Sequence, residues 1–317
     1  MISKLAVNLA PNHPGGLHLA NPVLVASGTF GYGTEYRELV DVDRLGGVIS
    51  KGITVNARAG NPTPRIAETP SGMLNAIGLQ NIGVDRVVSE MAPMWARWDV
   101  PVIVNISGES LTEFEHLATA LDGVPGIAGL ELNISCPNIT RGGRLFADDP
   151  DSAAAATRAV RRNTSFPIMV KLSPNVNDIV TIARAVEDEG TDAISLINTL
   201  VAMQIDLERR RPRIANITAG LSGPAVRPVA VRMVYQVAQA VSVPIVGIGG
   251  ISVMEDALEF LMAGASAIQV GTANFVNPRA STEIIDGLAD YVTLHGLEHI
   301  CDVVGAALPK REPAPVR

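Results

Sequence analysis

Eight short apolar runs, rich in Val and Ile, recur along the chain, each separated from the next by a stretch long enough for a helix. They cover residues 23–26, 47–50, 102–106, 130–134, 168–172, 193–197, 245–248 and 267–270. Strands that alternate with helices predict repeated βα units and a parallel sheet. Eight such units predict a closed (β/α)8 TIM barrel, an α/β fold that commonly runs to about 250 residues as one domain.

Helix-like segments at 151–163, 178–189, 228–240 and 252–263 lie between these runs, and Asn177 or Asp178 is expected to cap the second of them. Ahead of the first run, residues 5–9 and 16–19 alternate in polarity, which predicts an N-terminal β-hairpin that plugs the lower end of the barrel. We therefore expect one barrel domain over residues 1–308, with the N-terminal hairpin and with insertions in the active-site loops. A flexible tail is expected over 309–317, which is rich in Pro and charge.

Charge and cysteine content exclude several classes of function. The formal net charge is −7, with both signs spread along the chain, so no footprint for nucleic acid is present. No signal peptide and no apolar stretch of membrane-spanning length are found, which predicts a cytoplasmic protein without a membrane anchor. Cys136 and Cys301 provide neither a disulfide framework nor a zinc or iron–sulfur pattern, so no metal site is expected. Cys301 lies in the apolar segment 300–304 and is expected to pack in the core.

Polar residues and glycines stand at or just beyond the end of every predicted strand. In barrels of this kind the active site lies at the C-terminal ends of the strands, so these residues should meet at one mouth. Strand ends are also polar simply because strands end at the surface, but buried lysines and amides are costly unless they are paired. The set predicts a pocket for a flat, polar, anionic ligand; it consists of Ser27, Lys51, Asn105, Asn133 with Cys136, Lys171, Asn198 with Thr199, Gly249 with Gly250, and Gly271 with Thr272.

The last two predicted strands are followed by glycine-rich loops, Gly-Ile-Gly-Gly-Ile at 247–251 and Gly271-Thr272. TIM barrels frequently bind a phosphate at this place, where glycine lets backbone N–H groups approach the oxygens. The spacing is not a dinucleotide fingerprint, so a mononucleotide such as FMN fits better. Lys171 could then hold negative charge beside the flavin N1 and C2 carbonyl, or it could form a Schiff base, as in an aldolase.

The segment 133–138, Asn-Ile-Ser-Cys-Pro-Asn, resembles the active-site segment of class 1 dihydroorotate dehydrogenases. The resemblance covers nearly the whole chain and rests also on fragments at 21–22, 26–28, 50–54, 75–81, 170–174 and 197–199. Gly142-Gly143 with Phe146, and the segments 220–225 and 232–235, are similar to the catalytic subunit of subclass 1B. Ala147 and Ala219 depart from the family pattern, which has glycine at both positions.

The resemblance implies FMN-dependent oxidation of (S)-dihydroorotate to orotate, the redox step of de novo pyrimidine (UMP) biosynthesis. It implies that Cys136 is the catalytic base, which needs a pKa below the usual thiol value of about 8.5. The implied substrate-binding residues are Lys51, Asn75, Ala76, Ile77, Gly78, Leu79, Asn133, Asn198 and Thr199. The implied FMN-binding residues are Ser27, Lys51, Gly52, Asn105, Asn133, Lys171, Ile197, Gly223, Gly249, Gly250, Gly271 and Thr272.

Subclass 1B also implies a partner. Such catalytic chains pair with a separate subunit that carries FAD and a [2Fe–2S] cluster and passes electrons to NAD⁺, in a heterotetramer around a central dimer of catalytic chains. The basic run Arg209-Arg210-Arg211 is a solvated patch or a docking element for that partner. The alternatives are a fumarate-linked class 1A homodimer, a Schiff-base aldolase or lyase on the same barrel, and a non-catalytic barrel that retains a nucleotide pocket.

Overall fold

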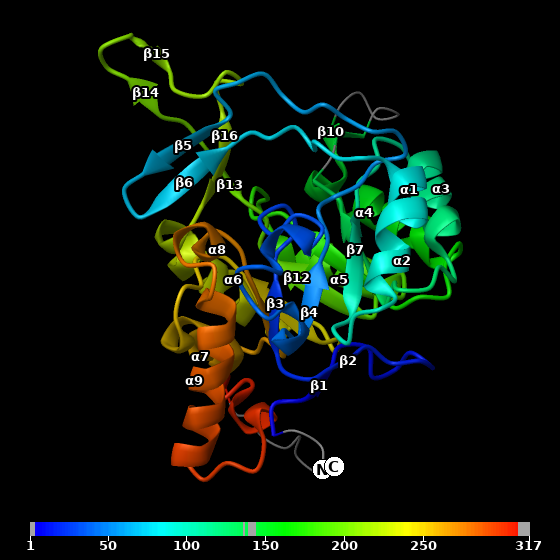
Figure 1. Cartoon of the computed structure of the whole chain (residues 1–317), viewed down its shortest axis with the longest axis vertical. Helices are drawn as coiled ribbons and strands as arrows, with labels where there is room; N and C mark the ends of the chain where they lie inside the picture. The colour runs from blue at the N-terminus through cyan, green and yellow to red at the C-terminus, as the bar shows by residue number, and fades with distance from the viewer. Residues whose placement is uncertain (1–3, 136, 139–143, 310–317) are drawn as a thin grey trace, which may run out of the picture.

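A closed barrel of eight parallel strands forms the centre of the computed structural model, which describes residues 4–135, 137–138 and 144–309 (Figure 1). The strands follow one another around the barrel in the order of the sequence, and the ends of each strand lie within one residue of the predicted ends. This confirms the predicted (β/α)8 barrel. The strands are β3 (Val23–Val25), β4 (Gly47–Ile49), β7 (Val102–Ile106), β8 (Gly129–Asn133), β11 (Ile168–Leu172), β12 (Ala193–Leu196), β17 (Ile245–Ile248) and β18 (Ala267–Val270).

Helices surround the barrel, and the four that the sequence predicted are present with ends shifted by at most two residues. Asp178 caps α5 as expected, because its carboxylate accepts from the backbone N–H groups of Val180 and Thr181. The helices are α1 (Val84–Arg86), α2 (Ala92–Trp95), α3 (Leu111–Leu121), α4 (Pro150–Arg161), α5 (Ile179–Asp188), α6 (Arg227–Ala238), α7 (Met254–Met262), α8 (Ala273–Val276) and α9 (Ala280–Leu294).

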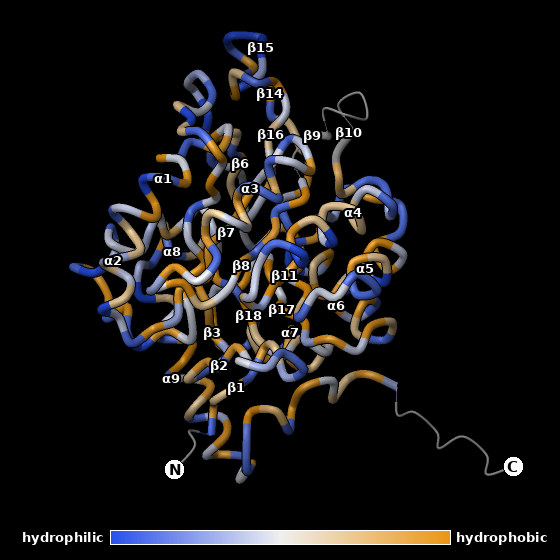
Figure 2. The backbone as a smooth tube through the Cα atoms, turned by 90° about the vertical axis from the view of Figure 1, so that its right-hand side faces the viewer, coloured by the Kyte–Doolittle hydropathy of each residue, from blue (hydrophilic) through white to orange (hydrophobic). Residues whose placement is uncertain are grey.

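The core is built from small and branched aliphatic side chains on both faces of the strands. All three residues of β3 are fully buried, as expected for a parallel strand covered on both sides. In the tube view, apolar residues predominate along the strands, whereas the outer helices alternate between apolar and polar residues (Figure 2). In the described part of the chain, no helix is long and apolar enough to cross a bilayer.

The predicted N-terminal hairpin is also present. Strands β1 (Val7–Asn8) and β2 (His18–Leu19) pair antiparallel below the barrel, and Leu9, Leu17 and Leu19 are buried there (Figure 1). The prediction for Cys301 was wrong: its side chain is exposed, because the 3₁₀ turn Ile300–Val303 directs Ile300 and Val303 inward instead. The predicted tail over 309–317 lies outside the described residues, apart from Pro309.

The active-site loop insertions that were expected form a second sheet above the barrel (Figure 1). This upper sheet is antiparallel, in the order β13 (Leu200–Ala202), β16 (Ala219–Ser222), β6 (Gly72–Asn75) and β5 (Ile66–Thr69). Strands β14 (Ile205–Asp206) and β15 (Arg211–Pro212) form a hairpin that projects beyond it, and β9 (Pro137–Asn138) pairs with β10 (Arg144–Leu145). The upper sheet has its own small core, which includes Leu74, Ile214 and Ala219.

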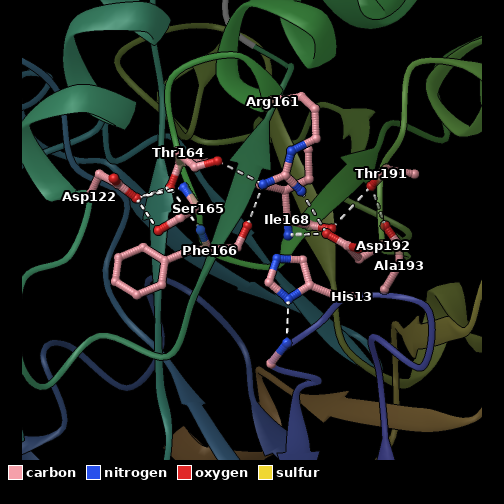
Figure 3. Close-up of polar contacts among 11 residues, drawn as sticks. His13, Asp122, Arg161, Thr164, Ser165, Phe166, Ile168, Thr191, Asp192 and Ala193 are labelled. Atoms are coloured by element: carbon pink, nitrogen blue, oxygen red, sulfur yellow. Dashed lines mark hydrogen bonds and ion pairs between the residues drawn. The ribbon is translucent and has the colours of Figure 1, made fainter.

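A polar network fastens the lower ends of the strands (Figure 3). The guanidinium of Arg161 forms an ion pair with Asp192 at 2.9 Å and donates to the carbonyls of Thr164 and Phe166. Asp192 also accepts from the backbone N–H of Ile168, the first residue of β11. These contacts hold β11 and β12 at the end of the barrel that is opposite to the predicted site.

Candidate active site

A cavity of about 650 Å³ opens at the C-terminal ends of the barrel strands, beneath the upper sheet. Every residue that the sequence predicted for the site lines this cavity, except Cys136, which lies outside the described residues. The predicted lining residues are Ser27, Lys51, Gly52, Asn75, Ala76, Ile77, Gly78, Leu79, Asn105, Asn133, Lys171, Ile197, Asn198, Thr199, Gly223, Gly249, Gly250, Gly271 and Thr272. The volume falls within the roughly 300–1,000 Å³ of ordinary small-molecule pockets.

The cavity is positively charged although the chain is acidic overall. Lys51, Arg65 and Lys171 line it, and none of the described lining residues is Asp or Glu. Lys171 is 5% exposed, and its Nζ lies 3.5 Å from Ser27 Oγ. Lys51 is half-buried, and this burial lowers the pKa of its ammonium group. The cavity is therefore suited to a ligand that carries negative charge.

One end of the cavity is formed by glycines in backbone conformations that side chains rarely adopt. Gly223, Gly249 and Gly250 have φ values of 98°, 130° and 75°. A Cβ on Gly250 would lie 2.8 Å from the carbonyl oxygen of Gly223, so the backbone here is closely packed. Thr272 donates from its hydroxyl to Ser222 Oγ at 2.8 Å, which places two hydroxyl groups beside these glycines. Backbone N–H groups without nearby side chains, together with hydroxyls, are the groups that commonly bind a phosphate.

The ends of β8 and β12 contribute a cluster of amides and hydroxyls. Asn198 Nδ2 donates to Ser135 Oγ at 3.0 Å and approaches Asn133 Oδ1 at 3.4 Å. Asn198 Oδ1 accepts from the backbone N–H of Thr199 at 2.8 Å. The cluster presents donors and acceptors together, as a ring with carbonyl and amide groups requires.

The loop 75–79 forms part of the cavity wall and is held from two sides. Strand β6 pairs with β16, so that Asn75 lies opposite Gly220. On the other side, Asn61 donates from its backbone N–H to the carbonyl of Ile77 and from its side-chain Nδ2 to the carbonyl of Ala76. The loop also contains two residues with positive φ, Gly78 at 74° and Leu79 at 52°. Its conformation is thus fixed by neighbouring segments and not by its own sequence alone.

Asn81 connects the same loop to Thr54, which follows β4 in the chain. It is 6% exposed, and its Nδ2 donates to the carbonyl of Leu79 at 2.7 Å and to Thr54 Oγ1 at 2.8 Å. Its Oδ1 accepts from the backbone N–H groups of Gly83 at 2.8 Å and Thr54 at 3.3 Å. Asn81 does not line the cavity and acts through the loop.

The floor of the cavity contains a buried oxygen that needs a ligand. Asn105 is 1% exposed, and its Oδ1 has no hydrogen-bond partner in the described protein. A Cβ on Gly52 would lie 2.7 Å from this oxygen and 3.8 Å from Leu79, and all three residues line the cavity. Such an acceptor is costly to bury without a donor, and an N–H group of a molecule bound in the cavity would offset that cost.

Several lining residues were not predicted from the sequence. Ser135 and Ser222 directly precede the predicted residues Cys136 and Gly223. Only Ser135 follows a predicted barrel strand, so inspection of the whole strand-end segment would have found Ser135 and not Ser222. Arg65 and Phe275 reach the cavity from the insertion before β5 and from α8, where no strand end marks them. No pattern in the sequence distinguishes these two from other surface residues.

Comparison with known proteins agrees with this geometry. The family model described as Dihydroorotate dehydrogenase matches residues 9–292. Relatives from Desulforudis audaxviator and Geotalea daltonii are 57% and 55% identical over 96% and 92% of this chain, and 97% and 95% of their own. A relative from Pelobacter propionicus is 54% identical over 96% of this chain and 99% of its own. All three carry the name dihydroorotate dehydrogenase B (NAD(+)), catalytic subunit. The chain belongs to the dihydroorotate dehydrogenase family.

Proposed function

We propose that this chain is the catalytic subunit of a dihydroorotate dehydrogenase B, which oxidises (S)-dihydroorotate to orotate with FMN in pyrimidine biosynthesis. The observation that carries the proposal is a single positively charged cavity with glycine-rich loops at one end and an amide cluster from β8 and β12 at the other. The first end suits a phosphate, and the second suits a ring with carbonyl and amide groups.

The residues present fit FMN. Gly223, Gly249, Gly250, Gly271 and Thr272 would hold its phosphate, because four of these five residues have no side chain of their own to cover the backbone N–H group. Its ring would contact the remaining predicted cofactor residues, namely Ser27, Lys51, Gly52, Asn105, Asn133, Lys171 and Ile197. Asn105 Oδ1, a buried acceptor without a protein partner, would be satisfied by the ring. When bound, FMN supplies the hydride acceptor that the oxidation requires.

The chain's own residues would bind the substrate and move a proton. Lys51 would hold the carboxylate with backbone groups of the loop 75–79, and Asn133, Asn198 and Thr199 would bind the ring carbonyls and amides. Cys136, through its Sγ, would take the proton from C5 as the hydride leaves C6. Ser135, which directly precedes it, lines the cavity, and this supports a role for the next residue at the same wall.

We further propose that electrons leave through a partner subunit with FAD and a [2Fe–2S] cluster and reach NAD⁺, in a cytoplasmic heterotetramer. The names of the relatives support this, because they specify NAD⁺ and a catalytic subunit. A partner surface is also available around the projecting β14–β15 hairpin. There Val201, Met203 and Leu207 are exposed near the basic run 209–211.

The proposal is tested by two measurements on the purified chain. The bound flavin is released by heat and identified, and orotate formation from dihydroorotate is followed with an artificial electron acceptor. FMN and orotate are the expected results. A chain with FMN that makes no orotate would contradict the substrate, and a chain without flavin would favour the aldolase alternative with Lys171 as the Schiff base. If fumarate reoxidises the reduced flavin of the chain without a partner subunit and NAD⁺, class 1A would be indicated.

A further inference from the structure

Glu131 is a fully buried carboxylate directly below the cavity, and the function proposed above does not use it. It lies on β8 and is 0% exposed. Its Oε2 accepts from Asn105 Nδ2 at 2.6 Å, and its Oε1 accepts from Ser195 Oγ and Gln269 Nε2, both at 2.8 Å. These partners lie on β7, β12 and β18, so one side chain joins four strands across the barrel interior.

The arrangement of donors around Glu131 determines how the amides point. Both carboxylate oxygens of Glu131 accept here, so each neighbouring amide turns its NH₂ group toward the carboxylate and its oxygen away. Both amides show this orientation, because Asn105 Oδ1 and Gln269 Oε1 have no partner in the described protein. For Asn105, the oxygen turned away from Glu131 is the one beside Gly52 at the cavity wall.

We propose that Glu131 is a positioning residue that keeps Asn105 turned so that its Oδ1, and not its Nδ2, faces the ring of the bound cofactor. This rests on the proposed function, in which the ring is the isoalloxazine of FMN. The pyrimidine edge of that ring alternates carbonyl groups with a single N–H. An acceptor can pair with the N–H, whereas an NH₂ group in its place would leave the N–H without a partner and expose a second donor.

The variant Glu131→Gln tests this with almost no change of shape. The new amide has one acceptor and one donor, and two of the three neighbours, Ser195 and Gln269, donate to the position of Oε1. The amide oxygen should therefore take that position and the NH₂ group the position of Oε2. Asn105 must then turn its Oδ1 toward the new NH₂ group, and its Nδ2 toward the cavity. We expect the affinity of the apoprotein for FMN, measured by quenching of FMN fluorescence, to fall about tenfold or more.

A second variant separates the effect of the side-chain orientation at position 105 from the effect of altered packing around position 131. In the double variant Glu131→Gln with Asn105→Asp, the carboxylate and the amide exchange places, and residue 105 again presents an acceptor to the cavity. We expect this exchange to restore the affinity for oxidised FMN to within about threefold of the wild-type value. If the affinity fell only because position 131 had lost its carboxylate, a change at position 105 would not restore it. Thr157→Val, which removes a buried hydroxyl that donates to Ala153 in α4, serves as the control for loss of a buried hydrogen bond away from the cavity.

The outcomes are distinct. Weak binding by Glu131→Gln, recovery in the double variant and normal binding by Thr157→Val would support the inference. Wild-type affinity in Glu131→Gln, or no recovery in the double variant, would overturn it while leaving the proposed function intact. Failure of the wild-type apoprotein to bind FMN would overturn both.

Discussion

Lys51 is half-buried at the cavity wall, and its surroundings shift the pKa of its ammonium group in opposite directions. Burial lowers the pKa of its ammonium group, and the coulombic effect of Glu35 raises it by a smaller amount. Nearby Arg65 adds to the lowering. The side chain thus loses its proton at a lower pH than an ordinary lysine does.

This shift predicts a pH dependence for the binding of orotate. The charged form that holds the anionic ligand is present below the lowered pKa and is lost as the pH rises through it. We expect the affinity for orotate, measured from the change in the flavin spectrum between pH 7 and 10, to fall about tenfold as this charge is lost. Lys51→Arg should keep its charge and bind with a flatter profile, and it corrects for any titration of the ligand. Identical profiles for the two proteins would exclude Lys51 as the group responsible.

Gly250 provides a second prediction at the scale of the residue. Gly250→Ala places a Cβ 2.8 Å from the carbonyl of Gly223 at a φ of 75°, within the proposed phosphate site. Gly123→Ala is a matched control, because Gly123 has a φ of 67° and no atom within 4 Å of its added Cβ. Both variants should lose about 1–2 kcal/mol of stability through the left-handed backbone, and Gly250→Ala should lose more because its Cβ also overlaps the Gly223 carbonyl. Only Gly250→Ala should lose FMN during gel filtration, and equal retention of FMN in both would argue against a phosphate at this loop.

At the scale of the element, the loop 75–79 and the upper sheet form a wall that the barrel alone would not provide. Asn81 joins this wall to Thr54, which follows β4, through four hydrogen bonds: two with Thr54, one with Leu79 and one with Gly83. Because Asn81 does not itself line the cavity, its replacement should disturb the substrate more than the cofactor.

We expect Asn81→Ala to raise the KM for dihydroorotate about tenfold while the affinity for FMN stays within about threefold of the wild type. Stability to urea should fall by about 1–3 kcal/mol, since buried backbone groups lose their partners. Asn81→Asp keeps the acceptor for Gly83 but sets a carboxylate oxygen against the carbonyl of Leu79, and should raise the KM at least as much as Asn81→Ala. An increase in the Kd of FMN equal to the increase in KM would show that Asn81 supports the whole cavity, and not the loop.

The barrel strands could be predicted from the sequence because each is a continuous apolar run, such as Ile-Met-Val-Lys-Leu in β11. The upper sheet could not, because its strands are three or four residues long and largely half-exposed, like β5 with Ile-Ala-Glu-Thr. The strand-end rule found polar or glycine residues of the cavity at all eight strand ends, since parallel strands bring their C-terminal ends together, whereas the loop 75–79 and Gly223 came only from the family resemblance. The rule missed Arg65, which comes from an insertion. The prediction for Cys301 was wrong for another reason, because the apolar composition of 300–304 does not show which side chains of the turn face the core.

At the scale of the whole molecule, the contacts that stabilise the barrel and the cavity proposed to be the active site lie at opposite ends of the barrel. The lower end carries the hairpin and the network around Arg161 and Asp192, while the cavity lies at the upper end. Asp122 belongs to the lower end (Figure 3). Its carboxylate accepts from the backbone N–H and hydroxyl of Ser165 and from the hydroxyl of Thr164.

These hydrogen bonds, above all the one from the backbone of Ser165, lower the pKa of Asp122 from its usual value of 3.8. A lowered folded-state pKa gives stability that is present above the unfolded pKa and is lost as the pH falls through the folded value. We expect Asp122→Asn to remove a few tenths of a kcal/mol of stability at pH 7, because solvent screens this exposed group, and less at pH 3. Urea unfolding at both values measures this, and FMN affinity should not change. An equal loss at both pH values would mean that the carboxylate charge contributes nothing.

The central claim is that one cavity brings FMN, dihydroorotate and Cys136 together. It is tested most directly by the visible spectrum of the purified protein under anaerobic conditions, recorded before and after addition of dihydroorotate. We predict that the flavin absorbance is bleached in the wild type and that Cys136→Ala, although it binds flavin, is bleached at least about a hundredfold more slowly. A bound flavin that stays oxidised in the wild type, or that is reduced equally fast in Cys136→Ala, would contradict the account.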